Sequence, residues 1–159
     1  MNHYLIKEET YKAYEYLIDI FKHNNLNLNL KHSSATAEEN EILIANEIYK
    51  YFGTHYFKCI NSLNEMRNKT EYINIIENVD KINILDIGCN VGTATYSYID
   101  TYLETKDEND ICYINVVFIE VSKIRVNWLE KMFEKYISEI NKAIEFIPQG
   151  VLDNKLYFL

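Results

Sequence analysis

Long apolar runs are missing from this chain of 159 residues. No uninterrupted apolar stretch approaches the roughly 20 residues that a membrane-spanning helix needs. The first four residues, Met1 to Tyr4, also lack the basic and then apolar run of a secretory signal peptide. We therefore expect a chain that is neither exported nor inserted into a membrane.

Cysteine is scarce and is not arranged for cross-linking or metal binding. Cys59, Cys89 and Cys112 are odd in number, lie far apart and include no Cys-x-x-Cys pair, which argues against a disulfide framework and a zinc site. None of the four histidines has a second histidine four residues away, the spacing that places two imidazoles on one helical face. We expect no metal and a reducing compartment, the cytoplasm or, as the alternative, the nucleus.

Arginine is rarer still. The chain has only Arg67 and Arg125 against fourteen lysines, and its net charge is −8. This balance is poor for a protein that grips nucleic acid through a broad phosphate-binding surface. It leaves room for recognition of one terminal phosphate by a few local cations. We expect Lys123, Arg125 and Lys131 to form a solvated helix face rather than an RNA-binding track.

The length allows one domain with a substantial core rather than two, and the first 80 residues are predicted to be mostly helical. Apolar side chains recur at helical spacing from Tyr4 to His23. Thr36 opens a capping box that predicts a second helix, and Gly53 predicts its end. A further helix is expected over Tyr72 to Val79. We expect residues 1–80 to form a helical extension that packs on the core.

From residue 81 onward, short apolar runs alternate with longer amphipathic segments. The short runs predict buried strands, and the longer segments predict helices. The order strand, helix, strand, helix, strand is typical of a parallel sheet with crossover helices. We expect an α/β fold in which residues 81–159 form a truncated Rossmann-like parallel sheet of three to four strands. The predicted elements are strands at 82–87, 113–120 and 143–147 and helices at 91–103 and 122–140.

The segment from Asn83 to Thr93 carries the clearest functional signal. It predicts a strand that enters a glycine-containing turn and opens a helix, the place where open α/β folds bind nucleotides. Gly88 and Gly92 remove side chains from this turn, and Asn90 is of the residue type most able, after glycine, to take a left-handed conformation. We expect a ligand to approach the backbone there.

A dinucleotide-binding fingerprint does not fit this turn, because Asn90 and Thr93 replace its second and third glycines. Asp86, two positions before Gly88, would repel a pyrophosphate and attract the ammonium group of an amino-acid ligand. The residues therefore favour a ligand with a cationic amino-acid part. Cys89 is interpreted as a small buried filler, since no base with the needed spacing accompanies it.

Glu120 closes the second predicted strand, Val116 to Ile119. A carboxylate at this position can accept both ribose hydroxyls, which favours a nucleoside ligand. Its separation from Gly88 exceeds the usual roughly 20 residues. We interpret the polar stretch 104–110 as a loop insertion, which accounts for the longer separation.

Leu85 to Gly92, read as Leu-Asp-Ile-Gly-Cys-Asn-Val-Gly, resembles motif I of the class I S-adenosylmethionine-dependent methyltransferases. Phe118 to Ser122 resembles their motif II, and Ile144 to Val151 stands where their third strand and adenine-contacting turn lie. The resemblance covers Lys81 to about Asp153, close to half of the chain. It departs from the family at Gly150, where an aspartate often reaches the adenine amino group.

This resemblance implies S-adenosylmethionine as the cofactor and methyl transfer as the activity. It also implies that Gly88 and its neighbours approach the methionine part, that Glu120 binds ribose, and that Val121 and Val151 flank the adenine. The cofactor-binding residues expected in this segment are Asp86, Gly88, Cys89, Asn90, Gly92, Glu120, Val121 and Val151.

A narrower resemblance is to the methylphosphate capping enzymes, which methylate a 5′-terminal phosphate of RNA. It rests on the Gly-Cys-Asn form of motif I, on the long loop before the second strand, and on Gly53 followed by aromatic residues and then Arg67. It implies that Arg67 helps to hold the cofactor and that an RNA 5′ end is the partner. The sequence departs from that family at Thr54, where asparagine is usual, and at Tyr56-Phe57, which is out of register.

Two classes of function stay open. The first is a methyltransferase whose substrate-binding half is missing after Asp153, so that this chain alone should transfer methyl groups slowly or not at all until another chain completes it. The second is a non-catalytic Rossmann-like module that binds a partner protein. An exposed apolar edge at Leu156 to Leu159 would favour completion by another chain.

Overall fold

The computed structural model describes residues 6–28, 40–67, 69, 79–107, 110–140, 144–147 and 152–153, the last two segments as backbone only. Four expectations lie outside these residues: the capping box at Thr36, most of the helix Tyr72 to Val79, the adenine contact of Val151, and the edge Leu156 to Leu159. The described residues contain four helices and a parallel sheet, so the chain is an α/β protein. None of these helices is long and apolar enough to cross a membrane.

Two helices precede the sheet: α1 spans Glu8–His23 and α2 spans Glu41–Arg67. Asn40 begins α2 by accepting a hydrogen bond from the Leu43 N–H through its side-chain oxygen (3.1 Å). Gly53 does not end this helix, which corrects the prediction of a stop there. The helix continues because its next turn buries Tyr56 in the core, which outweighs the roughly 1 kcal/mol cost of an interior glycine.

The sheet is built on two full strands, β1 at Lys81–Ile87 and β2 at Cys112–Glu120. They pair in parallel from Lys81 opposite Tyr113 to Ile87 opposite Ile119. Between and after them lie α4, Thr93–Leu103, and α5, Lys123–Glu139. This segment of the predicted element order is confirmed.

The prediction of three to four strands in a Rossmann-like sheet is corrected, because β1 and β2 alone are full strands among the described residues. The segments β3, Ile144–Ile147, and β4, Leu152–Asp153, make short parallel backbone pairings along β2. Segments of four and two residues are shorter than an ordinary strand of about five or six residues and add few ladder hydrogen bonds.

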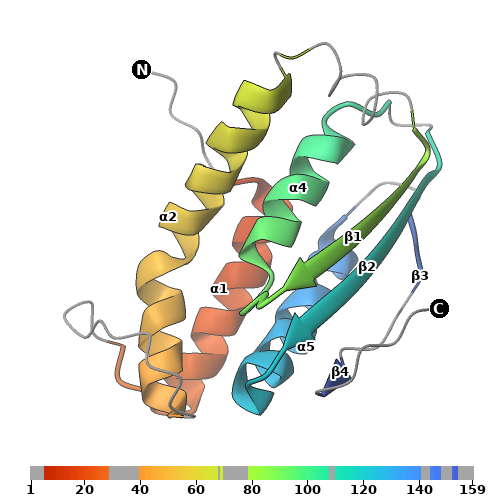
Figure 1. Cartoon of the computed structure of the whole chain (residues 1–159). Helices are drawn as coiled ribbons and strands as arrows, with labels where there is room; N and C mark the ends of the chain where they lie inside the picture. Colours follow the sequence, from red (N-terminus) through yellow and green to blue (C-terminus); the bar gives the residue numbers. More distant parts are fainter. Residues whose placement is uncertain are drawn as a thin grey trace.

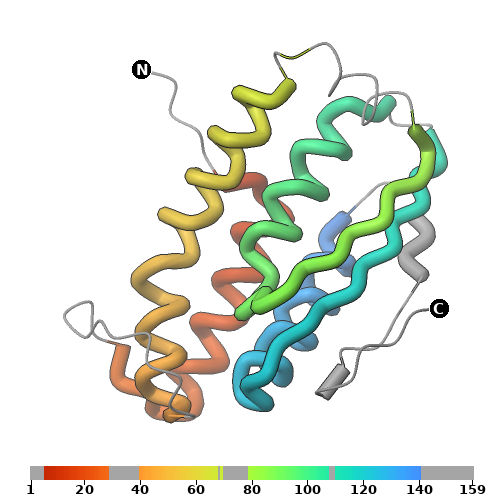
Figure 2. The backbone as a smooth tube through the Cα atoms, viewed as in Figure 1, coloured from red at the N-terminus to blue at the C-terminus, as the bar shows by residue number. Residues whose placement is uncertain are grey.

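The four helices lie on one face of the sheet (Figure 1). The backbone path shows α4 next to β1 and α5 next to β2, with α2 packed on α4 and α1 packed on α5 (Figure 2). The core between these layers is strongly aromatic, and its largest fully buried side chains include Trp128, Tyr56, Tyr96, Tyr102 and Tyr136. On the other face of the sheet, Leu85 and Ile87 are 55% and 70% exposed.

A buried carboxylate joins all four helices. Asp100 of α4 accepts hydrogen bonds from the hydroxyls of Thr10 in α1 (2.6 Å), Tyr56 in α2 (2.7 Å) and Tyr136 in α5 (2.7 Å). Burial raises the pKa of Asp100 to about 6, and the three donated hydrogen bonds oppose that rise. The helices are therefore positioned against the sheet by one polar centre as well as by apolar packing.

Candidate functional site

The turn between β1 and α4 contains three residues of positive φ. Gly88, Asn90 and Gly92 have φ values of 70°, 53° and 81°. Glycine tolerates this left-handed region without penalty, and asparagine tolerates it better than most other residues. The Gly88 N–H donates to the Ile119 carbonyl oxygen (2.7 Å), which holds the turn against the carboxyl end of β2.

The two glycines of this turn have different surroundings. A Cβ atom at Gly88 would meet no atom within 4 Å, so a ligand can approach the backbone there. A Cβ atom at Gly92 would lie 3.0 Å from Leu129 Cδ1, 3.2 Å from Phe118 Cε1 and 3.3 Å from Tyr96 Cε2. Gly92 therefore serves the packing of the helices on β2, whereas Gly88 borders open space.

Gly92→Ala is expected to lower the free energy of unfolding by roughly 2 to 5 kcal/mol, because it combines overpacking with a left-handed alanine. Gly53→Ala is the matched control, since its new Cβ would make only an ordinary 3.7 Å contact with Ile6. The control should raise stability by about 0.5 to 1 kcal/mol. Urea unfolding followed by circular dichroism measures both, and equal stability of the two variants would contradict this account of Gly92.

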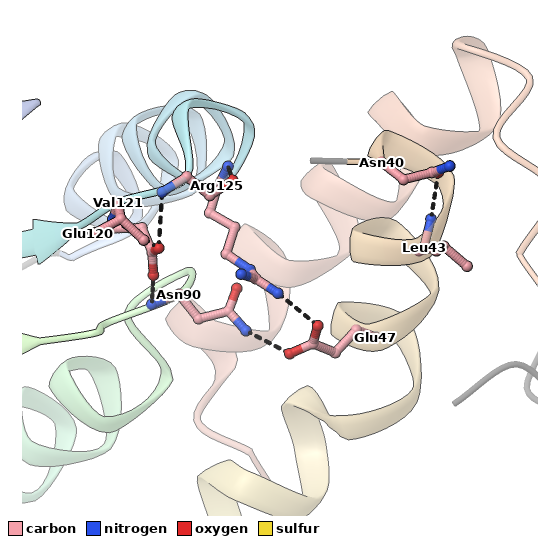
Figure 3. Close-up of polar contacts among 8 residues, drawn as sticks. Asn40, Leu43, Glu47, Asn90, Glu120, Val121 and Arg125 are labelled. Carbon is pink, nitrogen blue, oxygen red and sulfur yellow. Dashed lines mark hydrogen bonds and ion pairs between the residues drawn. The ribbon is translucent and has the colours of Figure 1, made fainter. Parts of the chain in front are cut away.

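Glu120 is 6% exposed and joins the turn to the start of α5. Its Oε2 accepts from the Asn90 N–H (2.9 Å), and its Oε1 accepts from the N–H groups of Val121 (2.9 Å) and Ser122 (3.0 Å), as Figure 3 shows in part. A carboxylate has about four acceptor positions. The structure therefore uses three of them for the backbone, whereas the sequence suggested that both oxygens were available for ribose.

Asp86 is the sixth residue of β1, two positions before Gly88, and its side chain contacts α4. Its Oδ2 accepts a hydrogen bond from the Thr95 hydroxyl of α4 (2.7 Å). Burial raises the pKa of Asp86, and the hydrogen bonds from Thr95 oppose the rise. The carboxylate lines a cavity of about 410 Å³ between α2, β1 and α4, whose other lining residues are Lys58, Cys59, Ser62, Leu63, Ile84, Leu85, Ala94, Thr95 and Tyr98.

Cys89 is buried under the turn, and its thiol is free. Burial raises its pKa to about 12, with smaller contributions from the charges of Asp86 and Glu120. A thiol with so high a pKa stays protonated at neutral pH and is a poor nucleophile. This environment agrees with the interpretation of Cys89 as a buried filler.

The structure does not bring Arg67 to the turn. Arg67 ends α2 and lies 3.6 Å from Glu104, which follows the last residue of α4. The turn precedes the first residue of α4, and a helix of 11 residues spans about 16 Å. Val121 lies next to the turn and is 73% exposed. Val151 is outside the described residues.

Glu47 and Arg125 are site residues that the sequence did not indicate. Arg125 Nη2 donates to Glu47 Oε2 (2.7 Å), and the side chains are 14% and 17% exposed. The Asn90 side-chain amide donates to Glu47 Oε1 (3.3 Å), so Glu47 bridges α5 and the turn (Figure 3). Arg125 therefore does not belong to a solvated helix face, which corrects that expectation. Its rarity and its place five residues after Glu120 were the available signals.

Comparison with known proteins adds no relative. No family model, curated protein or solved structure matches the chain. Within the described part of the chain, no group of three or more His, Cys, Asp or Glu side chains is placed to hold a metal ion. The functional argument therefore rests on the geometry around the β1–α4 turn.

Proposed function

We propose that this chain binds S-adenosylmethionine, as the cofactor-binding part of a class I methyltransferase. The observation that carries the proposal is the position of Asp86, which is partly buried and lines a cavity of about 410 Å³ together with Ala94 and Thr95 at the start of α4. Small-molecule sites commonly have volumes of about 300 to 1,000 Å³ with mainly apolar walls and a few polar groups. This cavity has both properties.

The charge of Asp86 fits one end of the proposed cofactor. S-adenosylmethionine carries an ammonium group and a sulfonium, and a carboxylate in a partly buried site attracts such cations more strongly than one in water. Leu63, Ile84 and Tyr98 supply apolar wall for the aliphatic part of the ligand. The sulfonium supplies an activated methyl group, so the protein has mainly to bind and orient it.

Glu120 fits the ribose of the cofactor only in part. With three acceptor positions used by backbone N–H groups, about one remains for a ribose hydroxyl. A second hydroxyl can bind Glu120 if the Asn90 N–H gives way. The acceptor suggested by the narrower resemblance, an RNA 5′ phosphate, stays a prediction.

Titration calorimetry with S-adenosylhomocysteine, the demethylated cofactor, tests the proposal. Ligand at 100 times its dissociation constant should add about 2.7 kcal/mol of stability. Asp86→Asn should bind the ligand's ammonium end about tenfold more weakly, a loss of about 1.4 kcal/mol. Asp19→Asn, on the exposed face of α1, makes the same charge change and should leave binding unaltered. Absence of heat at millimolar ligand would overturn the proposal.

A second candidate is a non-catalytic module that pairs with another chain. It is favoured by the face of the sheet opposite the four helices, where Leu85 and Ile87 are more than half exposed, and by the 73% exposure of the neighbouring Val121. Exposed apolar patches of this kind often mark protein-binding surfaces. A chain that folds but does not bind S-adenosylhomocysteine would favour this function over the first.

A further inference from the structure

Glu47, Asn90 and Arg125 form a polar contact that we call the Glu47 latch. It fastens the second turn of the chain's longest described helix, α2, to the β1–α4 turn and to the first turn of α5. The Arg125–Glu47 pair is charge-assisted, short at 2.7 Å and mostly buried. Such a pair is stronger than an exposed ion pair because solvent screens it less.

The latch is connected to Glu120 through a single residue. The backbone N–H of Asn90 donates to Glu120, and the side-chain amide of Asn90 donates to Glu47. Asn90 cannot release Glu120 without moving, and Glu47 restrains that movement. The hydrogen-bonding capacity of Glu120 is therefore linked to the position of α2.

Two further observations show that α2 sits closely on the turn and that the latch is imperfectly satisfied. The hollow bounded by Glu47, Phe52, Asn90 and Thr93 holds only about 10 Å³, the lower limit of what one water molecule needs. Among the described residues, Asn90 Oδ1 and Arg125 Nε are buried without a hydrogen-bond partner. Unsatisfied buried polar atoms cost stability, so each of them calls for a structural or functional explanation.

We propose that Glu47 is a positioning residue that holds the cofactor-binding turn closed in the free chain, and that a nucleoside binding to Glu120 opens the latch. The inference rests on the proposed function, because it concerns the same site. The ligand's second ribose hydroxyl replaces the Asn90 N–H at Glu120 Oε2. Asn90 then moves away from Glu47, so part of the binding energy is used to open the latch.

Glu47→Gln removes the charge that holds Arg125 while keeping the size and most of the shape of the side chain. It should bind S-adenosylhomocysteine about tenfold more tightly than the parent chain, within the usual range of coupling between linked sites. It should also unfold at a lower urea concentration. A merely structural ion pair would lower stability without tightening binding, so the opposite signs of the two effects identify a latch.

Arg125→Gln breaks the same pair from α5 and should also tighten binding, which keeps the test valid if one variant fails to fold. Glu139→Gln is the control, since it weakens the ion pairs of Glu139 with Lys12 of α1 and with Lys135 of α5, away from the turn. It should leave the affinity unchanged. Equal or weaker binding by both latch variants, with the parent chain binding normally, would overturn the latch alone. No binding by any chain would overturn both the latch and the proposed function.

Discussion

Asp100→Leu is expected to lower the free energy of unfolding by roughly 3 kcal/mol or more. Three buried hydroxyls, from Thr10, Tyr56 and Tyr136, would lose their common acceptor, and each unsatisfied buried donor costs about 1 to 3 kcal/mol. Relief of the buried carboxylate charge offsets part of this loss. For a domain of this size the melting temperature should fall by about 6 to 12 °C. Urea and thermal unfolding measure the effect, and a loss below about 1 kcal/mol would contradict it.

Asp100 should also make the free energy of unfolding fall as the pH rises, which is the opposite of the usual effect of a carboxylate. Its pKa is about 6 in the folded chain against 3.8 for the ordinary group, so the folded state binds the proton more tightly. The stability that this proton contributes is present near pH 4, is lost as the pH rises to about 6, and stays constant above that. Asp100→Asn cannot titrate. The difference in stability between the parent chain and this variant should therefore change between pH 4 and 6, and a flat difference would contradict the buried, titrating carboxylate.

Glu120→Ala is expected to lower stability by roughly 3 kcal/mol and to abolish measurable binding of S-adenosylhomocysteine. It removes three charge-assisted hydrogen bonds, from Asn90, Val121 and Ser122, each with a net worth of about 1.5 to 3 kcal/mol, and removal of the buried charge offsets part of this loss. Glu120→Gln keeps a carbonyl oxygen for Val121 and Ser122 and should lose about half as much. The two variants thus separate the anchoring of α5 from that of the turn.

Ser122→Ala is the control for the Glu120 variants. Its hydroxyl caps the same helix by accepting from the Arg125 N–H (3.4 Å), and loss of a cap costs about 1 kcal/mol. It should leave ligand binding intact. Urea unfolding and calorimetry on all three variants test the prediction. A Glu120→Ala chain as stable as the Ser122→Ala chain would show that the three backbone bonds are weak.

The elements from Lys81 to Glu139 could be predicted because their signals are local. Short apolar runs mark β1 and β2, and glycines and polar residues bound each element, so the predicted limits differ from the observed ones by at most two residues. The end of α2 was wrong because the burial of Tyr56 depends on distant helices. The predicted number of strands was also wrong, since a short apolar run indicates that a segment is extended and buried but does not determine how many residues pair with the neighbouring strand.

The candidate site was predictable only where sheet geometry brings residues together. The carboxyl ends of parallel strands lie side by side, so the nearness of Gly88 and Glu120 followed from the strand order. Glu47 is 43 residues from Asn90 and 78 from Arg125, and no spacing rule links positions so far apart. The Asp100 centre joins residues separated by 36 to 90 positions and left no mark in the sequence for the same reason.

The contrast between Gly88 and Gly92 has an evolutionary consequence. Gly92 is favoured by the contacts of Leu129, Phe118 and Tyr96, so a descendant that keeps this helix packing is expected to keep a glycine there. Gly88 borders open space, and an asparagine or aspartate could supply its backbone conformation. A lineage that replaces Gly88 with a bulky residue while retaining Gly92 would have preserved the scaffold after selection on the ligand had ended. The residues at the two positions would thus indicate whether a related chain has kept the proposed ligand site.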